Sequence, residues 1–172
     1  MSLEPQIVEV DHSGKPRRFV FVLMNDFTML CFAAAIESLR IANRTAGKEL
    51  YKWKIISEGG QDAVCSNGCA FHVDDDLCEL ERDDTIMMCG GIDIQKATTK
   101  RTLNWLRREA RRGAAIAGLC TAGYTMAKAG LLDGKKATIH WENQDSFAEE
   151  FEEVVLTKSV FVVDGNRITT AG

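Results

Sequence analysis

The segment 118–123, GLCTAG, constrains the fold of this chain more than any other stretch. It lies between an apolar run at 114–117 and a small-residue helical pattern at 124–130. A strand that turns sharply into a helix at a cysteine is typical of a nucleophile elbow, which presents the side chain at the top of a sheet beside a helix N-terminus. This placement makes Cys120 the main candidate site residue and predicts a lowered thiol pKa. The alternative is a buried cysteine that only packs.

Apolar runs that alternate with helical patterns predict the rest of the fold. We expect strands at 17–24, 51–57, 69–73, 85–89, 114–119, 137–140, 154–156, 160–163 and 167–170, and helices at 29–43, 99–112, 124–130 and 143–151. Strands that are apolar on both faces predict an α/β fold, a three-layer α/β/α sandwich with a mostly parallel sheet. Ligands of such sheets lie beyond the carboxyl ends of the strands, where residues 25–26, 90–91 and 120 fall.

Composition narrows the function. The chain has 172 residues, which predicts one domain, and a net charge of −4, which argues against nucleic-acid binding by this chain. It contains no apolar run long enough for a membrane span and no signal peptide at its start. Its six cysteines lack CxxC and Cys/His spacing, so we expect reduced thiols in a cytoplasmic protein without a metal or cofactor.

Two further segments need an interpretation. Residues 1–16 are polar and turn-rich, and we expect them to form a flexible tail before a domain at 17–172. The basic run at 100–112 predicts the solvated face of a helix that turns Leu103, Leu106 and Ala110 inward.

Several residues near the elbow could line a pocket. Gly90 and Gly91 could present backbone N–H groups to a carboxylate or oxyanion, or could simply end a strand. His140 could act as a base for the thiol or could be a hydrogen-bonded structural histidine. Trp141 and Glu142 together would suit a cationic ligand, although core packing is the slightly favoured interpretation of Trp141.

Three segments together resemble the N-terminal sensor domain of AraC-family transcriptional regulators, namely residues 25–43, 89–93 and 118–142. The part that reads AGLLDG followed by ATIHWE is the most specific. That domain is of the PfpI type, in the class I glutamine amidotransferase-like superfamily, so the resemblance implies a flavodoxin-like sandwich over residues 17–172. Within the group the chain is most similar to regulators of arginine, glycine betaine and carnitine catabolism. The resemblance also implies an AraC-type helix-turn-helix domain that would follow residue 172.

The same resemblance bears on catalysis. Enzymes of the superfamily pair the elbow cysteine with an acidic residue early in the first helix, and aligning residues 20–23 with their first strand places Cys31 there. Asp26 is carboxylic but has the wrong spacing, and Thr121 stands where some of these enzymes have histidine. Loss of the acid removes a proton-transfer partner. We therefore expect that the chain is not an enzyme.

Three functions follow from these observations. The preferred one is a ligand-sensing and dimerisation domain of a transcriptional regulator, a homodimer that contacts DNA only through the implied C-terminal domain. Its effector would be an amino acid or quaternary amine, bound near Gly90, Gly91, Cys120, Thr121, His140, Trp141 and Glu142. The alternatives are a cysteine-dependent amidase, hydratase or glyoxalase-like enzyme, and a redox sensor that oxidises Cys120.

Overall fold

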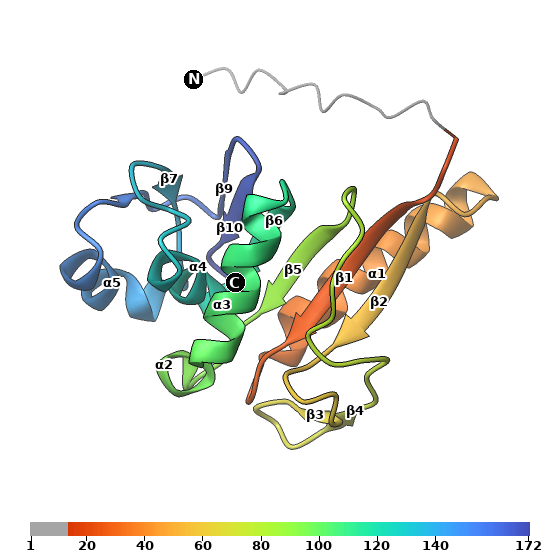
Figure 1. The fold of residues 1–172 in the computed structure, drawn as a ribbon, viewed down its shortest axis with the longest axis horizontal. Helices are drawn as coiled ribbons and strands as arrows, with labels where there is room; N and C mark the ends of the chain where they lie inside the picture. Colours follow the sequence, from red (N-terminus) through yellow and green to blue (C-terminus); the bar gives the residue numbers. More distant parts are fainter. Residues whose placement is uncertain (1–13) are drawn as a thin grey trace.

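A six-stranded sheet runs through the centre of the protein (Figure 1). The computed structural model describes residues 14–172. The strand order is β2-β1-β5-β6-β10-β9, and all neighbours are parallel except the β9–β10 pair. In chain order these strands are β1 (Arg17–Leu23), β2 (Tyr51–Ile56), β5 (Thr85–Cys89), β6 (Ala115–Leu119), β9 (Phe161–Asp164) and β10 (Arg167–Thr170). The predicted mostly parallel sheet is confirmed.

Helices cover both faces of this sheet. The longest, α1 (Met29–Ala46), lies on one face, and α3 (Lys100–Arg111) and α4 (Gly123–Lys128) pack on the other (Figure 1). The shorter helical segments are α2 (Ile94–Ala97), η1 (Cys120–Ala122), η2 (Trp141–Asn143) and α5 (Gln144–Glu150). The side chain of Thr99 caps α3 by accepting a hydrogen bond from the Thr102 N–H at 3.0 Å. The three-layer sandwich is therefore confirmed.

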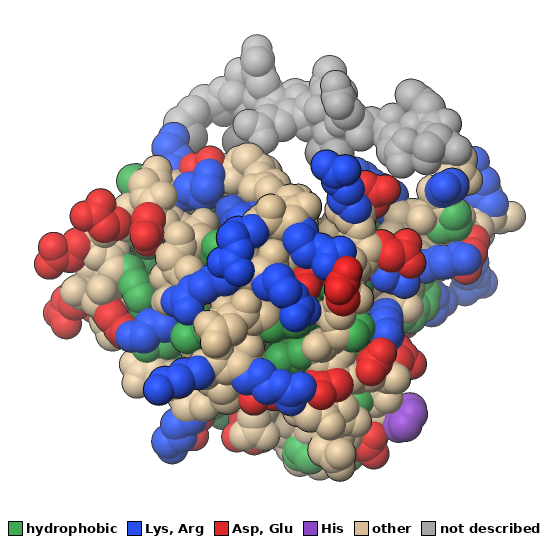
Figure 2. Space-filling view, in the orientation of Figure 1, with side chains coloured by type: hydrophobic (Ala, Val, Ile, Leu, Met, Phe, Trp, Pro, Cys, Tyr) green, Lys and Arg blue, Asp and Glu red, His purple; other side chains and the backbone are tan. Residues whose placement is uncertain are grey.

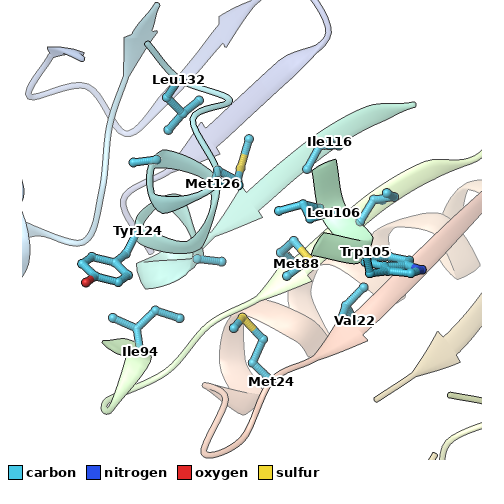
Figure 3. Packing of buried hydrophobic residues seen from close by; sticks show 14 of the residues in the cluster. Val22, Met24, Met88, Ile94, Trp105, Leu106, Ile116, Tyr124, Met126 and Leu132 are labelled. Carbon is cyan, nitrogen blue, oxygen red and sulfur yellow. The ribbon is translucent and has the colours of Figure 1, made fainter. Parts of the chain in front are cut away.

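Strand β1 shows how the sequence builds two cores. Its side chains alternate between the faces of the sheet, so Val20 and Val22 join one buried cluster whereas Phe21 and Leu23 join the other. Figure 3 shows the first cluster, which the sheet shares with α3 and α4. The second lies under α1, where Phe32 makes edge-to-face contacts with Phe21, Phe27 and Phe71.

Two predicted strands are shorter than expected. Only β4 (Ala70–Phe71) forms within 69–73, and it pairs with β3 (Ala63–Val64) outside the main sheet. Only β7 (Lys136–Ala137) forms at the start of 137–140, beside β8 (Val155–Leu156). The second strand stops early because the residues that follow Ala137 bond to groups that do not belong to a strand ladder. The N–H of Thr138 donates to Thr169 Oγ1 at 2.9 Å, and the N–H of His140 donates to the Cys120 carbonyl at 3.3 Å.

The basic run on α3 forms a solvated helix face, as predicted. Figure 2 shows lysine and arginine side chains over this helix, and several pair with acidic neighbours. Arg101 bonds to Asp76 and Arg112 to Glu79, while Leu106 is fully buried on the inner side.

Residues 1–13 lie outside the described residues, so the tail predicted for 1–16 stays a prediction. Within residues 14–172, no helix is both long and apolar enough to cross a bilayer.

Candidate functional site

The predicted elbow forms between β6 and α4. Cys120 follows directly after β6 and has a left-handed backbone with φ +59°, an uncommon conformation for a residue with a side chain. Its N–H donates to Thr170 Oγ1 at 3.2 Å, and its carbonyl accepts from the His140 N–H. A Cβ on Gly118 would lie 2.9 Å from the backbone nitrogen of Gly123, which cannot rotate away, so the turn favours a glycine there. The strained elbow is therefore fixed by its neighbours on β10 and before η2.

The pair Gly90–Gly91 joins the end of β5 to this elbow. A Cβ on Gly91 would lie 1.7 Å from the Asp26 carbonyl oxygen, and one on Gly90 would lie 2.5 Å from the Ala122 nitrogen. The N–H of Gly90 donates to the Leu119 carbonyl at 3.4 Å, and the binding of a carboxylate or oxyanion by the Gly90 and Gly91 N–H groups stays a prediction. The glycines allow two turns to approach β5 closely.

A cavity of about 210 Å³ opens beside the elbow at the carboxyl ends of the parallel strands. Its lining residues are Thr28, Gly91, Ile92, Cys120, Thr121, His140, Glu142 and Asn143. Five of these belong to the predicted set. Gly90 and Trp141, also predicted, do not line it.

Three residues that line the cavity were not predicted from the sequence, namely Thr28, Ile92 and Asn143. Thr28 and Ile92 come shortly after the ends of β1 and β5, and this position at the carboxyl end of a parallel strand could have indicated that they line the cavity. Asn143 directly precedes α5. The Ile92 side chain is 74% exposed, which places an apolar group at the mouth of the cavity.

The thiol of Cys120 is not activated. Its residue is only 5% exposed, and its Sγ lies 3.8 Å from the Thr28 hydroxyl. Burial raises the pKa of Cys120 above its ordinary value, the Thr28 hydroxyl offsets this in part, and the carboxylate of Glu142 raises the pKa further. The prediction that the helix N-terminus lowers this pKa is therefore wrong, because desolvation outweighs it.

Cys31 lies on the other side of Thr28. Its Sγ donates to the Thr28 carbonyl at 3.0 Å, and the residue is 8% exposed in the first turn of α1. The hydrogen bond from the Cys89 thiol lowers the pKa of Cys31. Among the described residues, Thr28 is the hydrogen-bond partner of the Cys120 sulfur, and no carboxylate bonds to it.

Two acidic residues before and within α1, Asp26 and Glu37, are engaged elsewhere. Asp26, with φ +54°, accepts a hydrogen bond from the Asn25 side chain at 3.0 Å. Glu37 pairs with Arg40 one turn later, with Nε to Oε1 at 2.8 Å. Neither carboxylate is bonded to the elbow thiol.

His140 and Glu142 line the cavity, and Trp141 lies between them in the chain without lining it; we call these three residues the outer wall. The Nδ1 atom of His140 accepts from the Glu142 N–H at 3.4 Å and lies 3.8 Å from the Glu142 carboxylate. Trp141 is 69% exposed, so the core-packing interpretation of this residue is wrong. Its ring centroid lies 5.6 Å from that of His140. The wall thus offers a carboxylate and an aromatic face to solvent. In the part of the chain that the structure describes, no group of three His, Cys, Asp or Glu side chains could hold a metal ion.

Comparisons with known proteins agree with this geometry. The DJ-1/PfpI family model matches residues 17–172. The chain belongs to the DJ-1/PfpI family. It is 38% identical over 154 residues to the HTH-type transcriptional regulator CdhR of Pseudomonas aeruginosa, covering 90% of this chain and 46% of that protein. It is 34% identical to the HTH-type transcriptional regulator GlxA of Rhizobium meliloti, over 93% of this chain and 50% of that protein.

A solved structure of an AraC family transcriptional regulator from Pseudomonas putida is 25% identical, with a TM-score of 0.78, and the match covers 91% of this chain and 84% of that one. The chain spans about half the length of the curated relatives it matches. The similarity to PfpI-type domains of transcriptional regulators is therefore confirmed.

Proposed function

We propose that this DJ-1/PfpI chain is the ligand-sensing and dimerisation domain of an AraC-family transcriptional regulator in the cytoplasm. The main support for the proposal is the environment of the elbow thiol. The elbow sulfur of Cys120 has a threonine hydroxyl as its partner at 3.8 Å, and Cys31 occupies the turn of α1 beside that threonine. A buried neutral thiol without a carboxylate is a poor nucleophile, whereas the cavity around it remains available for a ligand.

The chemistry of the outer wall supports a cationic effector. Glu142 supplies an exposed negative charge at the elbow cavity, and Trp141, which does not line the cavity, supplies an exposed aromatic face next to His140. Quaternary ammonium groups are recognised by this combination of aromatic face and carboxylate. An amino acid would present its ammonium to the same wall. We therefore place the effector between Cys120 and Glu142.

The curated relatives support the rest of the proposal. Their names describe HTH-type transcriptional regulators, and each is about twice as long as the matched region. We propose that a helix-turn-helix domain follows this domain in the full-length protein and contacts DNA. Effector binding and homodimerisation through the present domain would then set the spacing of two such DNA-binding domains.

Calorimetric titration with glycine betaine, carnitine and arginine tests the ligand class. We expect at least one of them to bind, and Glu142→Gln to weaken that binding about tenfold because a charge-assisted contact is lost. Glu149→Gln is the matched control, since it removes the same charge from an exposed position on α5 outside the cavity. Absence of binding by all three compounds, or equal weakening in both variants, would contradict the proposal.

The strained backbone of Cys120 favours a second candidate, a cysteine-dependent enzyme, because nucleophile elbows hold their nucleophile in this conformation. Turnover of an amide, an isonitrile or methylglyoxal that is lost in Cys120→Ser would establish it. We expect no such turnover.

A further inference from the structure

A second cavity lies at the same edge of the sheet, on the other side of the 24–28 turn. Its volume is about 330 Å³, compared with about 210 Å³ beside the elbow. Met24 and Asn25 line it from this turn, whereas Thr28 lines the elbow cavity. Backbone hydrogen bonds hold the turn between the two, with the Asp26 N–H donating to the Val64 carbonyl and the Thr28 N–H to the Gly90 carbonyl. The two cavities are therefore separate, and the second lies at the ends of β1 and β2.

The second cavity has the anatomy of a small-molecule site. Its inner part is apolar, since the residues at the end of β1, Val22, Leu23 and Met24, are each at most 5% exposed. Its outer part is polar and comes from the segment after β2 and from α2 and α3. An apolar interior with a few placed polar groups and a volume above about 300 Å³ is typical of ligand pockets.

Two hydrogen bonds hold the exposed carboxylate of Glu58 in place. One of its oxygens, Oε2, accepts hydrogen bonds from Thr99 Oγ1 at 2.5 Å and from Thr102 Oγ1 at 2.6 Å. Thr102 is only 3% exposed and Thr99 caps α3, so both donors are themselves fixed. Both bonds go to Oε2, so the other Glu58 oxygen, Oε1, takes no part in them. Glu58 is also one of the residues that line the cavity. The carboxylate thus occupies the N-terminus of α3 and leaves no place there for the anionic end of a ligand.

Two further charges line the cavity from different elements. Asp62 follows Glu58 in the segment before β3, and Lys96 comes from α2. One Asp62 oxygen, Oδ1, lies 3.0 Å from His72 Nδ1, but the two side chains are 62% and 87% exposed, so this contact holds Asp62 weakly. The Nζ atom of Lys96 lies 3.3 Å from Asp93 Oδ2. Because the two side chains are 83% and 55% exposed, this ion pair holds the lysine weakly. The cavity therefore offers two carboxylates to a cation and one ammonium to an anion.

We propose that this cavity is a second small-molecule site, for a ligand with a primary ammonium and a carboxylate, that is, an amino acid. The ligand ammonium donates to Glu58 and Asp62, and the ligand carboxylate pairs with Lys96. A primary ammonium has three N–H donors, whereas a trimethylated one has none and cannot satisfy two carboxylates by hydrogen bonding. The second site therefore selects free amino acids over their N-trimethyl derivatives. This site does not depend on the function proposed for the elbow cavity.

The test is a titration of the whole chain with L-alanine, L-glutamine and L-arginine, with glycine betaine as the trimethylated comparison. Backbone amide chemical shifts give the location of binding. We expect at least one amino acid to bind and to shift the amides of residues 57–64 and 96–102, and glycine betaine to leave those amides unshifted. Shifts confined to Cys120, His140 and their neighbours would place the amino acid beside the elbow and overturn the proposal, as would absence of binding by all three amino acids.

Two pairs of variants sharpen the test. Glu58→Gln keeps an oxygen for the threonine hydroxyls but loses the charge, and we expect amino-acid binding to weaken at least about tenfold. Its control, Glu149→Gln, removes a charge from exposed α5. Val64→Trp fills the cavity from a position that is 43% exposed, and Val155→Trp, at 51%, is its control outside the cavity. Binding that survives both Glu58→Gln and Val64→Trp would overturn the proposal.

Discussion

Replacing Gly91 with alanine tests the close contact on which the site geometry depends. The added Cβ would lie 1.7 Å from the Asp26 carbonyl oxygen and 2.7 Å from the Phe27 Cα. Both are backbone atoms and cannot rotate away, so the 24–28 turn must move by more than 1 Å to reach an ordinary contact. Gly91 does not have a left-handed backbone, which means that the cost is steric alone.

The expected loss of stability can be worked out from the hydrogen bonds that a movement of the 24–28 turn would break. The turn is tied to its neighbours by the bonds from Asp26 to Val64 at 3.2 Å and from Thr28 to Gly90 at 2.9 Å. Losing these two bonds costs about 2 kcal/mol, and overpacking adds about 1–3 kcal/mol. We therefore expect Gly91→Ala to lower the free energy of unfolding by about 3–5 kcal/mol.

Urea denaturation followed by tryptophan fluorescence measures this change. The control is Gly134→Ala, at a glycine with φ +70° and no atom within 4 Å of the added Cβ, for which we expect a cost of about 1 kcal/mol from backbone conformation alone. Equal losses in the two variants, or a Gly91→Ala protein within about 1 kcal/mol of the parent, would refute the contact between β5 and the turn.

Three further predictions concern stability. Leu106→Ala removes a fully buried side chain from α3, and we expect urea denaturation to show a loss of about 3 kcal/mol. Asp84→Asn breaks the bonds from Arg18 at 2.8 and 2.6 Å to a 3% exposed carboxylate, which should cost about 2 kcal/mol and lower the calorimetric melting temperature by about 5 °C. Lys128 lowers the pKa of Glu150, so their pair stabilises the fold above the ordinary glutamate pKa and this contribution is lost as pH falls. Glu150→Gln should therefore cost less than about 1 kcal/mol at pH 7, and this cost should shrink as pH falls below the ordinary glutamate pKa of about 4.3, measured by urea denaturation across that range.

Local sequence patterns were sufficient for the fold and for the elbow. The alternation in β1 and the small residues at 118–123 act over a few positions, so the sheet and the turn at Cys120 could be predicted without tertiary information. The pKa of Cys120 could not, because it depends on how deeply the turn is buried and on a hydroxyl 92 residues away. Trp141 illustrates the same limit, since apolar character alone does not show whether a side chain is covered.

Five of the eight residues that line the elbow cavity were predicted from the sequence, but Thr28 and the lining of the second cavity were not. Glu58 meets its hydroxyl partners 41 and 44 residues later in the chain, where the fold brings the end of β2 to the start of α3. Thr28 occupies the N-cap position of α1, yet its side chain makes no capping bond, and its hydroxyl lies 3.8 Å from the elbow thiol. Such pairings arise from the packing of elements that are distant in sequence.

The central claim is that the elbow thiol is held neutral, with the Thr28 hydroxyl rather than a carboxylate as its hydrogen-bond partner among the described residues. The rate of Cys120 alkylation by iodoacetamide from pH 6 to 10, read by peptide mass spectrometry, tests it most directly. An ordinary thiol is about 3% ionised at pH 7, and we predict a smaller fraction for Cys120, with its reactivity rising only above pH ~8.5. Full reactivity of this cysteine at or below neutral pH would contradict the account and indicate an activated nucleophile.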